Sequence, residues 1–162
     1  MAATGTTDTP TPAPKPDRET LEAGSTLMPR FGPDGMIPCI SQDADTGDVL
    51  MFAYMNAESF RKTVETGQVH FWSRSRGKLW LKGESSGMTQ HVIELRLDCD
   101  QDCVLARVRV GGSTATGVAA SCHTGHPNCF YRRVRGVGDA DAGHTLETTS
   151  QKVFDPDAVY GS

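Results

Sequence analysis

Carboxylates and thiols alternate along one short stretch of the chain, which reads Asp-Cys-Asp-Gln-Asp-Cys from position 98 to position 103. In an extended segment successive side chains point to opposite faces, so the three aspartates would share one face and Cys99 would occupy the other. Carboxylate oxygens suit Mg²⁺ or Ca²⁺, whereas thiolates suit zinc. The stretch could therefore serve two metal ions of different chemistry, with oxygen ligands from Asp98, Asp100 and Asp102.

The aspartates do not begin an EF-hand, because that loop needs Gly at its sixth position and Glu at its twelfth. Counted from Asp98, these positions hold Cys103 and Arg109. A solvated acidic turn is the alternative to a metal site. Metal binding is favoured because like charges crowded at the end of a well-patterned strand repel one another, and a bound cation relieves that repulsion.

A second group of metal-binding residue types lies downstream, where residues 122–129 read Cys-His-Thr-Gly-His-Pro-Asn-Cys. The spacing of Cys122 and Cys129 matches no standard zinc knuckle. Cys99 could complete a three-thiolate site whose fourth position is open to water, which is the arrangement of catalytic zinc. His123 could be a ligand, a general acid/base or a surface residue, and its place inside the cluster favours a chemical role.

The other cysteines are better explained by packing, and the second histidine of this cluster is better explained as an ordinary residue of a turn. Cys39 lies in the apolar run of residues 37–40, and Cys103 begins an apolar strand. Free cysteine is often a small buried hydrophobic residue. His126 precedes a proline in a turn, so we expect no chemical role for it.

A basic and aromatic segment contains Arg74, Arg76, Lys78 and Lys82, flanked by Trp72 and Trp80. One explanation is an exposed edge strand whose cations prevent aggregation. The other is a clamp for phosphate and a planar base, because guanidinium groups match phosphate geometry. The clamp is favoured because the segment is basic in a chain of net charge −4. Trp72 could stack on the base or belong to the core.

The composition predicts one cytoplasmic domain. The chain has 162 residues and a mean hydropathy of −0.39, and its pI of about 5.7 favours no nucleic-acid partner. No apolar run is long enough for a membrane span, and no signal peptide opens the sequence. Five cysteines, an odd number without a secretion signal, indicate a reducing compartment in which clustered thiols bind metal more often than they form disulfides.

Alternating apolar residues predict the α+β class with a mostly antiparallel twisted sheet and one main helix. The alternation places Ile93, Leu95 and Leu97 on one face of their strand, opposite the charged side chains. The expected strands are residues 36–41, 49–54, 69–73, 78–82, 91–97, 104–110 and 130–134.

The main helix is predicted from its caps and its spacing of apolar residues. Asn56 is a good N-cap, and Gly67 stops the helix after about Thr66. Phe60 and Val64 stand one helical turn apart, so we expect both to be buried.

The distribution of polar and small residues predicts that the chain has three parts. Residues 1–20, rich in Thr, Pro and Ala, are predicted to be a disordered extension. Residues 21–136 form the domain, within which residues 111–121 are expected to be a mobile loop. Residues 137–162 form a C-terminal extension that is weakly structured or packed on the domain.

Six runs of residues together resemble the phosphoribosyl-AMP cyclohydrolase family. They lie at residues 43–47 (DADTG), 53–56 (AYMN), 70–76 (HFWSRSR), 82–87 (KGESSG), 97–102 (LDCDQD) and 122–125 (CHTG). The resemblance extends from Phe31 to Arg133. It implies a hydrolase that opens the adenine ring of 1-(5-phosphoribosyl)-AMP at the N1–C6 bond, the third step of histidine biosynthesis.

The resemblance also implies ligands for two metals and an intertwined homodimer. Zinc would be held by Cys122 and Cys129 of one subunit and Cys99 of the other, and Mg²⁺ by the three aspartates. No pyrophosphohydrolase domain follows in this sequence, so a monofunctional enzyme is expected. Two departures stand out: the connection from residue 110 to residue 122 is longer than usual, and Met88 stands where the family has Asn.

These features lead to a hypothesis for the mechanism. Zinc lowers the pKa of a bound water towards about 7, and the resulting nucleophile would add to C6 of the purine. His123 would deliver a proton to N1, since histidine titrates in the useful range. Arg74, Arg76 and Lys78 would hold phosphate, and Trp72 would stack on the base.

Two other functions share some of these residues. A zinc nucleoside deaminase also attacks C6 of adenine, but its H-x-E and P-C-x-x-C signatures are absent. A zinc-stapled binding module would have four protein ligands, so Cys103 or His123 would have to complete the site.

Overall fold

The computed structural model describes residues 17–112 and 119–161. The predicted disorder of residues 1–16 and the centre of the predicted mobile loop, residues 113–118, lie outside these ranges. None of the helices in the described ranges has the length and apolar character needed to cross a lipid bilayer.

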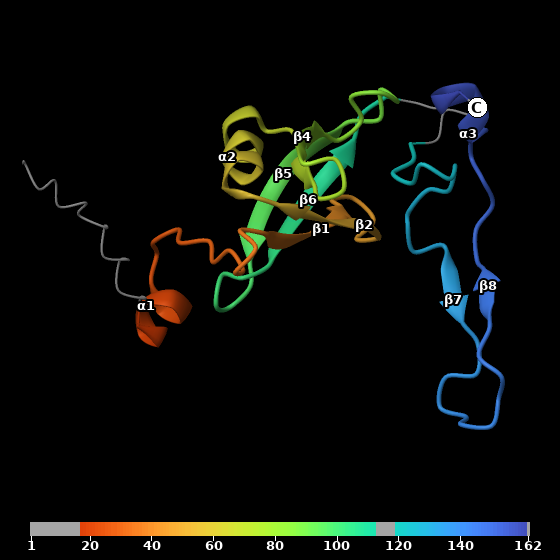
Figure 1. The fold of residues 1–162 in the computed structure, drawn as a ribbon, viewed down its shortest axis with the longest axis horizontal. Coiled ribbons are helices and arrows are strands. Elements are labelled where there is room, and N and C mark those ends of the chain that lie inside the picture. The colour runs from red at the N-terminus through yellow and green to blue at the C-terminus, as the bar shows by residue number, and fades with distance from the viewer. Residues whose placement is uncertain (1–16, 113–118, 162) are drawn as a thin grey trace, which may run out of the picture.

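A four-stranded sheet forms the centre of the molecule, with the order β2-β1-β6-β5 (Figure 1). Its strands are β1 (Ile37–Asp43), β2 (Val49–Met55), β5 (Gln90–Leu97) and β6 (Val104–Val110). The pairs β1–β2 and β5–β6 are antiparallel, and only the central pair, β1–β6, is parallel. The predicted α+β class with a mostly antiparallel sheet is confirmed.

The β1–β2 hairpin is closed by the acidic turn that the sequence indicated. The Asp43 carboxylate accepts hydrogen bonds from the backbone N–H groups of Asp45 and Thr46 at 2.9 and 2.8 Å. Such side-chain turns are a frequent use of Asp. The hairpin fixes β1 against β6, so the centre of the sheet has a defined register.

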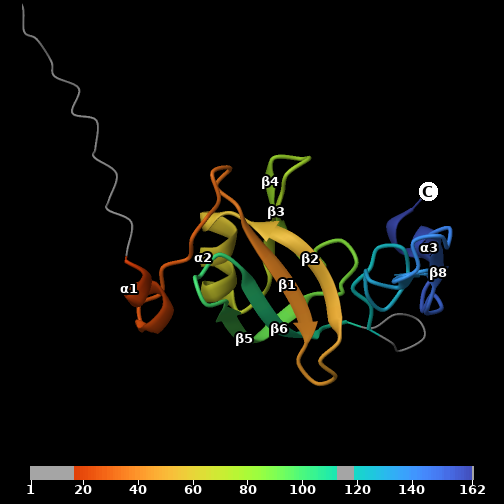
Figure 2. The ribbon, with the colours of Figure 1, turned by 90° about the horizontal axis from the view of Figure 1, so that it is seen from below.

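Helix α2 (Ala57–Thr66) covers one face of the sheet (Figure 2). Asn56 and Ser59 exchange side-chain and backbone hydrogen bonds in a capping box, and Gly67 ends the helix with a φ of 66°. Phe60 is buried as predicted, but the prediction for Val64 is wrong, since 52% of its surface is exposed.

Thr63 occupies the buried position beside Phe60 instead of Val64. Its hydroxyl donates to the Ser59 carbonyl at 2.8 Å and accepts the His70 N–H at 2.9 Å. These bonds satisfy the buried hydroxyl and tie α2 to the next strand.

Strand β5 departs from the regular alternation that the sequence suggested. A bulge between Val92 and Glu94 inserts Ile93 as an extra residue, so Val92 pairs with Val108 and Glu94 with Arg107. A bulge shifts the side-chain alternation by one position. Val92, Leu95 and Leu97 consequently pack against the core, whereas Ile93 is 51% exposed, contrary to the prediction.

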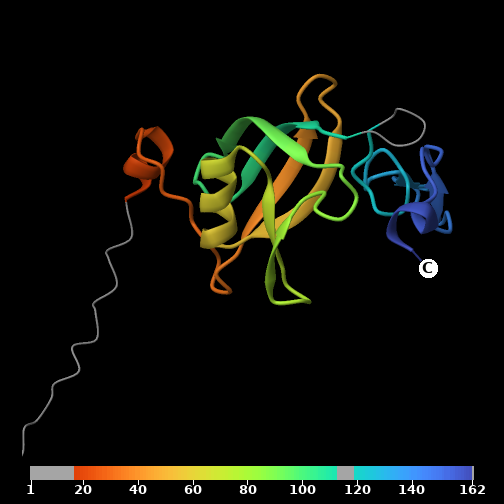
Figure 3. The ribbon, with the colours of Figure 1, turned by 90° about the horizontal axis from the view of Figure 1, so that it is seen from above.

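A second hairpin, β3 (His70–Ser73) with β4 (Lys78–Leu81), projects from the sheet (Figure 3). Its inner residues join the core: Phe71 is fully buried and Trp80 packs against it with ring centroids 5.6 Å apart. The rest of the hydrophobic core comes mainly from the central sheet and α2, together with Val69, which precedes β3, and Phe31.

The C-terminal residues form a small lobe at one end of the sheet (Figure 1). It contains β7 (Arg132–Val134), β8 (Leu146–Thr148) and α3 (Pro156–Tyr160). The predicted strand at 130–134 is shorter, and no pattern in the sequence had indicated β8 or α3. At the opposite end lies α1 (Arg18–Ala23), capped by Asp17, which the sequence had also not indicated.

Candidate metal centres at two ends of the sheet

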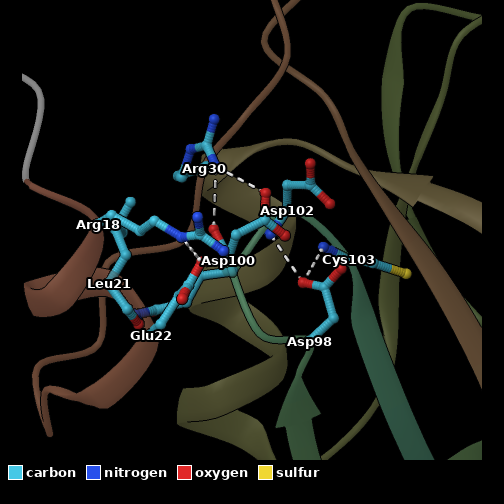
Figure 4. Close-up of polar contacts among 9 residues, drawn as sticks. Arg18, Leu21, Glu22, Arg30, Asp98, Asp100, Asp102 and Cys103 are labelled. Atoms are coloured by element: carbon cyan, nitrogen blue, oxygen red, sulfur yellow. Dashed lines mark hydrogen bonds and ion pairs between the residues drawn. The ribbon is translucent and has the colours of Figure 1, made fainter.

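The connection between β5 and β6, residues 98–103, brings three carboxylates together and is called the carboxylate loop below. One oxygen from each of Asp98, Asp100 and Asp102 lies within 4.8 Å of the others (Figure 4). Oxygen donors at this spacing suit a divalent cation such as Mg²⁺. The predicted grouping of these aspartates in space is therefore present.

The carboxylate loop is a tight turn and not the extended segment assumed from the sequence. Asp98 Oδ1 accepts the backbone N–H groups of Asp102 and Cys103 at 2.9 and 3.0 Å. Gln101 adopts a left-handed backbone with a φ of 61°. The turn lets alternate aspartates converge, whereas strand alternation would have spread them about 7 Å apart.

The aspartates of the carboxylate loop repel one another. The pKa of Asp102 is raised by partial desolvation and then by the negative charges of Asp100 and Asp98, while Arg30 opposes the rise. Arg30 donates to the Asp100 carboxylate at 2.8 Å and neutralises part of this charge. A divalent cation at the loop would relieve the remaining repulsion.

The other candidate centre is the thiol pair, Cys122 and Cys129, beside the C-terminal lobe. Cys122 is 4% exposed, and its Sγ lies 2.9 Å from the hydroxyl of Thr124. Cys129 is exposed as a residue. Desolvation around its thiol, followed by the charge of Cys122 and a hydrogen bond with it, raises the pKa of Cys129 to about 12.

Backbone hydrogen bonds hold the segment that carries the thiol pair. The Ser121 N–H donates to the Pro127 carbonyl at 2.9 Å, closing the loop between the cysteines. The Cys129 N–H donates to the Leu50 carbonyl at 2.7 Å and attaches this loop to β2. The two thiols are thus placed side by side by the fold.

Lys82 is a buried cation near the thiol pair. It is 5% exposed, and its backbone N–H donates to the Val69 carbonyl at 3.0 Å, whereas its ammonium group makes no hydrogen bond or ion pair with the described residues. Burial lowers the pKa of Lys82, and the charges of Cys129 and Cys122 raise it. The sequence had grouped Lys82 with the hairpin cations, but its charge instead acts on the thiols.

The chain folds tightly after Lys82. Gly83 has a φ of 89°, and a Cβ there would lie 2.3 Å from the carbonyl of Met88. Met88, where the resemblance had predicted Asn, is buried. This compact turn fixes the position of Lys82, the residue that follows β4.

The remaining hairpin cations are exposed, and the two arginines among them lie over aromatic rings. The guanidinium of Arg74 lies 3.9 Å from the centre of the Tyr54 ring, and that of Arg76 lies 5.8 Å from the Trp80 ring. Lys78 is exposed and Trp72 is half-buried. Within the described residues no hydrogen bond or ion pair joins the predicted substrate-binding residues to either candidate metal centre.

The two candidate centres lie at opposite ends of β5. Gln90, the first residue of β5, donates to the Ser121 hydroxyl at 3.2 Å, next to Cys122. Cys99 follows Leu97, the last residue of this eight-residue strand. At a rise of about 3.3 Å per residue the two ends are roughly 23 Å apart, so the exposed Cys99 cannot reach the thiol pair of its own chain.

The remaining cysteines and the two histidines of the second cluster differ in burial and in contacts. Cys39 is fully buried, as predicted, and burial raises its pKa to about 12. Cys103 is half-buried at the start of β6. His126 is buried, stacks on Tyr131 with ring centroids 3.7 Å apart and shares a hydrogen bond with the Ser150 hydroxyl at 3.0 Å. His123 is exposed beside Cys122.

Comparison with known proteins places these features in a class of enzyme, the cyclohydrolases. The family model of phosphoribosyl-AMP cyclohydrolase matches residues 51–131, which contain both candidate centres. A phosphoribosyl-AMP cyclohydrolase from Rhodopseudomonas palustris (strain BisA53) is 48% identical over 86% of this chain and 90% of its own. Another, from Bradyrhizobium sp. (strain BTAi1), is 52% identical over 83% of this chain and 97% of its own.

A third relative of the same name, from Hyphomonas neptunium, is 58% identical over 68% of this chain. The chain therefore belongs to the phosphoribosyl-AMP cyclohydrolase family.

Proposed function

We propose that the protein opens the adenine ring of 1-(5-phosphoribosyl)-AMP by hydrolysing the N1–C6 bond, as the third step of histidine biosynthesis. The observation that carries this proposal is the match to the family over residues 51–131, because that range includes the carboxylate loop and the thiol pair. The fold supports it by bringing the residues of each centre together.

The thiol pair has the donor chemistry of a zinc site. Two cysteine sulfurs side by side, one of them buried, suit a soft metal ion better than Mg²⁺. Within the described residues no third Cys, His, Asp or Glu joins the thiol pair in a metal-binding group. Cys99 of a second subunit would supply the third thiolate, so we propose a homodimer in which each zinc site spans two chains.

The carboxylate loop would hold Mg²⁺. Its three oxygens lie close together on the surface, where the ion can keep water ligands and contact a phosphate. Cys99 belongs to the same loop. In the proposed dimer, the magnesium ion of one chain would therefore lie near the thiol pair of the other.

Zinc, when bound, would supply a water whose pKa falls towards about 7. The protein residues orient the substrate and move the proton that ring opening requires at N1. His123 is exposed, adjoins Cys122 and is proposed to carry that proton. Arg74, Arg76 and Lys78 stay candidates for the phosphates, with Trp72 as a surface for the base.

The proposal is tested by assaying ring opening of Cys122→Ala with metal analysis of the same samples. Loss of a zinc ligand should lower activity by about three orders of magnitude or more and zinc content in proportion. His123→Ala should lower turnover far more than zinc content. Full activity of Cys122→Ala without bound zinc would contradict the proposed chemistry.

Cobalt substitution distinguishes the proposed site from a structural zinc site. Three thiolates with an exchangeable water are expected, whereas four protein ligands would indicate a structural role. Cys103 is a poor fourth ligand for its own chain's thiol pair, because it lies with Cys99 at the far end of β5.

A further inference from the structure

The carboxylate loop is attached to the N-terminal segment, residues 21–30, through Gln101. This residue lies between two of the aspartates, yet it is only 7% exposed. Its φ of 61° is a backbone conformation that Gly or Asn adopts more readily than Gln. A long side chain therefore occupies a position whose backbone conformation Gly or Asn adopts more readily.

The Gln101 side chain uses all its polar atoms on the N-terminal segment. Its Oε1 accepts the Met28 N–H at 2.8 Å. Its Nε2 donates to the carbonyl groups of Leu21 and Thr26, each at 3.3 Å. Because two donors and one acceptor match two carbonyl groups and one N–H, the amide orientation is defined by its partners.

Main-chain and ionic contacts extend the same junction. The Gln101 carbonyl accepts the Arg30 N–H at 2.7 Å, and the Arg30 side chain pairs with Asp100 at 2.8 Å (Figure 4). All these contacts join positions that are at least 70 residues apart in the sequence. In the described part of the chain the N-terminal segment pairs with no strand, and its hydrogen bonds to residues after position 30 all go to Gln101 or Asp100.

A cavity of about 1050 Å³ lies beside this junction. Its walls come from the carboxylate loop, from the N-terminal segment and from the start of β1, including Asp100, Asp102, Arg30, Phe31 and Met36. The position of the N-terminal segment therefore determines the shape of the space next to the carboxylates.

We propose that Gln101 is a positioning residue that couples the order of the N-terminal segment to metal binding by the carboxylate loop. It fixes residues 21–30 against the loop, and the loop in turn holds its aspartates at the spacing that a divalent ion requires. This inference rests on the proposed magnesium site. Gln101 itself would contact neither the metal ion nor the substrate.

Hydrogen exchange on the metal-free full-length protein tests the first half of the proposal. Gln101→Gly and Gln101→Asn suit the left-handed backbone, so both should fold, but neither side chain reaches the N-terminal segment. The Met28 amide should exchange at least about 10-fold faster in both variants, because it loses its acceptor. Arg61→Met, which removes an exposed ion pair on α2, is the control and should leave Met28 unchanged.

Binding of Mn²⁺ alone, followed by electron paramagnetic resonance, tests the second half. The dissociation constant should rise by about 10-fold in Gln101→Gly and Gln101→Asn and stay constant in Arg61→Met. Unchanged exchange at Met28, or unchanged Mn²⁺ affinity in both Gln101 variants, overturns the proposal while leaving the proposed function intact. Wild-type protein that binds no Mn²⁺ would overturn this proposal and the magnesium site together.

Discussion

The carboxylate loop and the thiol pair lie at opposite ends of one sheet and differ in how much of a metal site each chain supplies. The loop assembles three oxygen donors from residues close in sequence, on an exposed turn. The thiol pair offers two sulfur donors in partly desolvated surroundings. One chain thus groups three carboxylates by itself, whereas the proposed zinc site would take its third thiolate from a second chain.

The carboxylates of the loop and the thiols of the pair also differ in how they lose their protons. Carboxylates are ionised at neutral pH even when neighbouring charges raise their pKa, as at Asp102. The Cys129 thiol, with a pKa of about 12, is protonated until a metal ion displaces the proton. Zinc binding should therefore depend on pH much more strongly than magnesium binding.

The largest expected effect is this pH dependence of zinc affinity. Each proton released on binding raises the apparent affinity about 10-fold per pH unit, so zinc affinity should rise at least about 100-fold between roughly pH 6.5 and 8.5. Magnesium affinity should stay nearly constant there and fall only on acidification, earlier than for an ordinary aspartate because the pKa of Asp102 is raised. Chelator competition measures both, and a zinc affinity independent of pH would contradict the raised thiol pKa.

An intermediate effect is expected from Asp102→Asn, which removes one charge from the carboxylate loop and keeps the shape of the side chain. Mg²⁺ affinity should fall about 10- to 100-fold, as measured by calorimetry, and zinc content should stay constant. Asp45→Asn is a matched control, because Asp45 is an exposed aspartate whose partner is Arg109. Equal losses in the two variants would mean that the loop has no special role in binding the ion.

The smallest expected effect comes from Lys82→Met, which removes the buried cation near the thiol pair. Two or three thiolates around one zinc ion leave little or no net positive charge, and the charge of Lys82 favours the thiolate form of Cys129. Zinc affinity should therefore weaken by about 3- to 10-fold. Lys78→Met, on the exposed hairpin, should leave the zinc affinity unchanged. Neither variant should alter the Mg²⁺ affinity. A change of the same size in both variants would refute a specific role for Lys82.

Patterns of residues close in sequence predicted much of the fold. The Asp43 turn, the Asn56 cap and the alternation of β6 appear as expected, because each depends on residues close in sequence. The errors arose where packing overrode periodicity. Thr63 takes the buried position in place of Val64 since its hydroxyl has two partners, and the bulge at Ile93 shifts the faces of β5.

The candidate site was predictable as a set of residue types but not as a geometry. The grouping of the aspartates was anticipated, although a tight turn and not an extended strand produces it. Lys82 and Gln101 were missed as parts of the two regions, because their partners are distant in sequence and their types are usually exposed. Nor could spacing alone reveal that Cys99 and Cys122 stand at opposite ends of β5.

Complementation between two variants decides whether Cys99 completes the thiol pair of another chain. The Cys99→Ala and Cys122→Ala chains, each inactive alone, would carry different affinity tags. The two chains would be mixed, unfolded and refolded together. In a homodimer with shared sites, half of the random dimers are mixed and each mixed dimer has one intact site, so about a quarter of wild-type activity should return. Purified mixed dimers should bind one zinc ion each. No recovery of activity in purified mixed dimers would contradict a site shared between two chains.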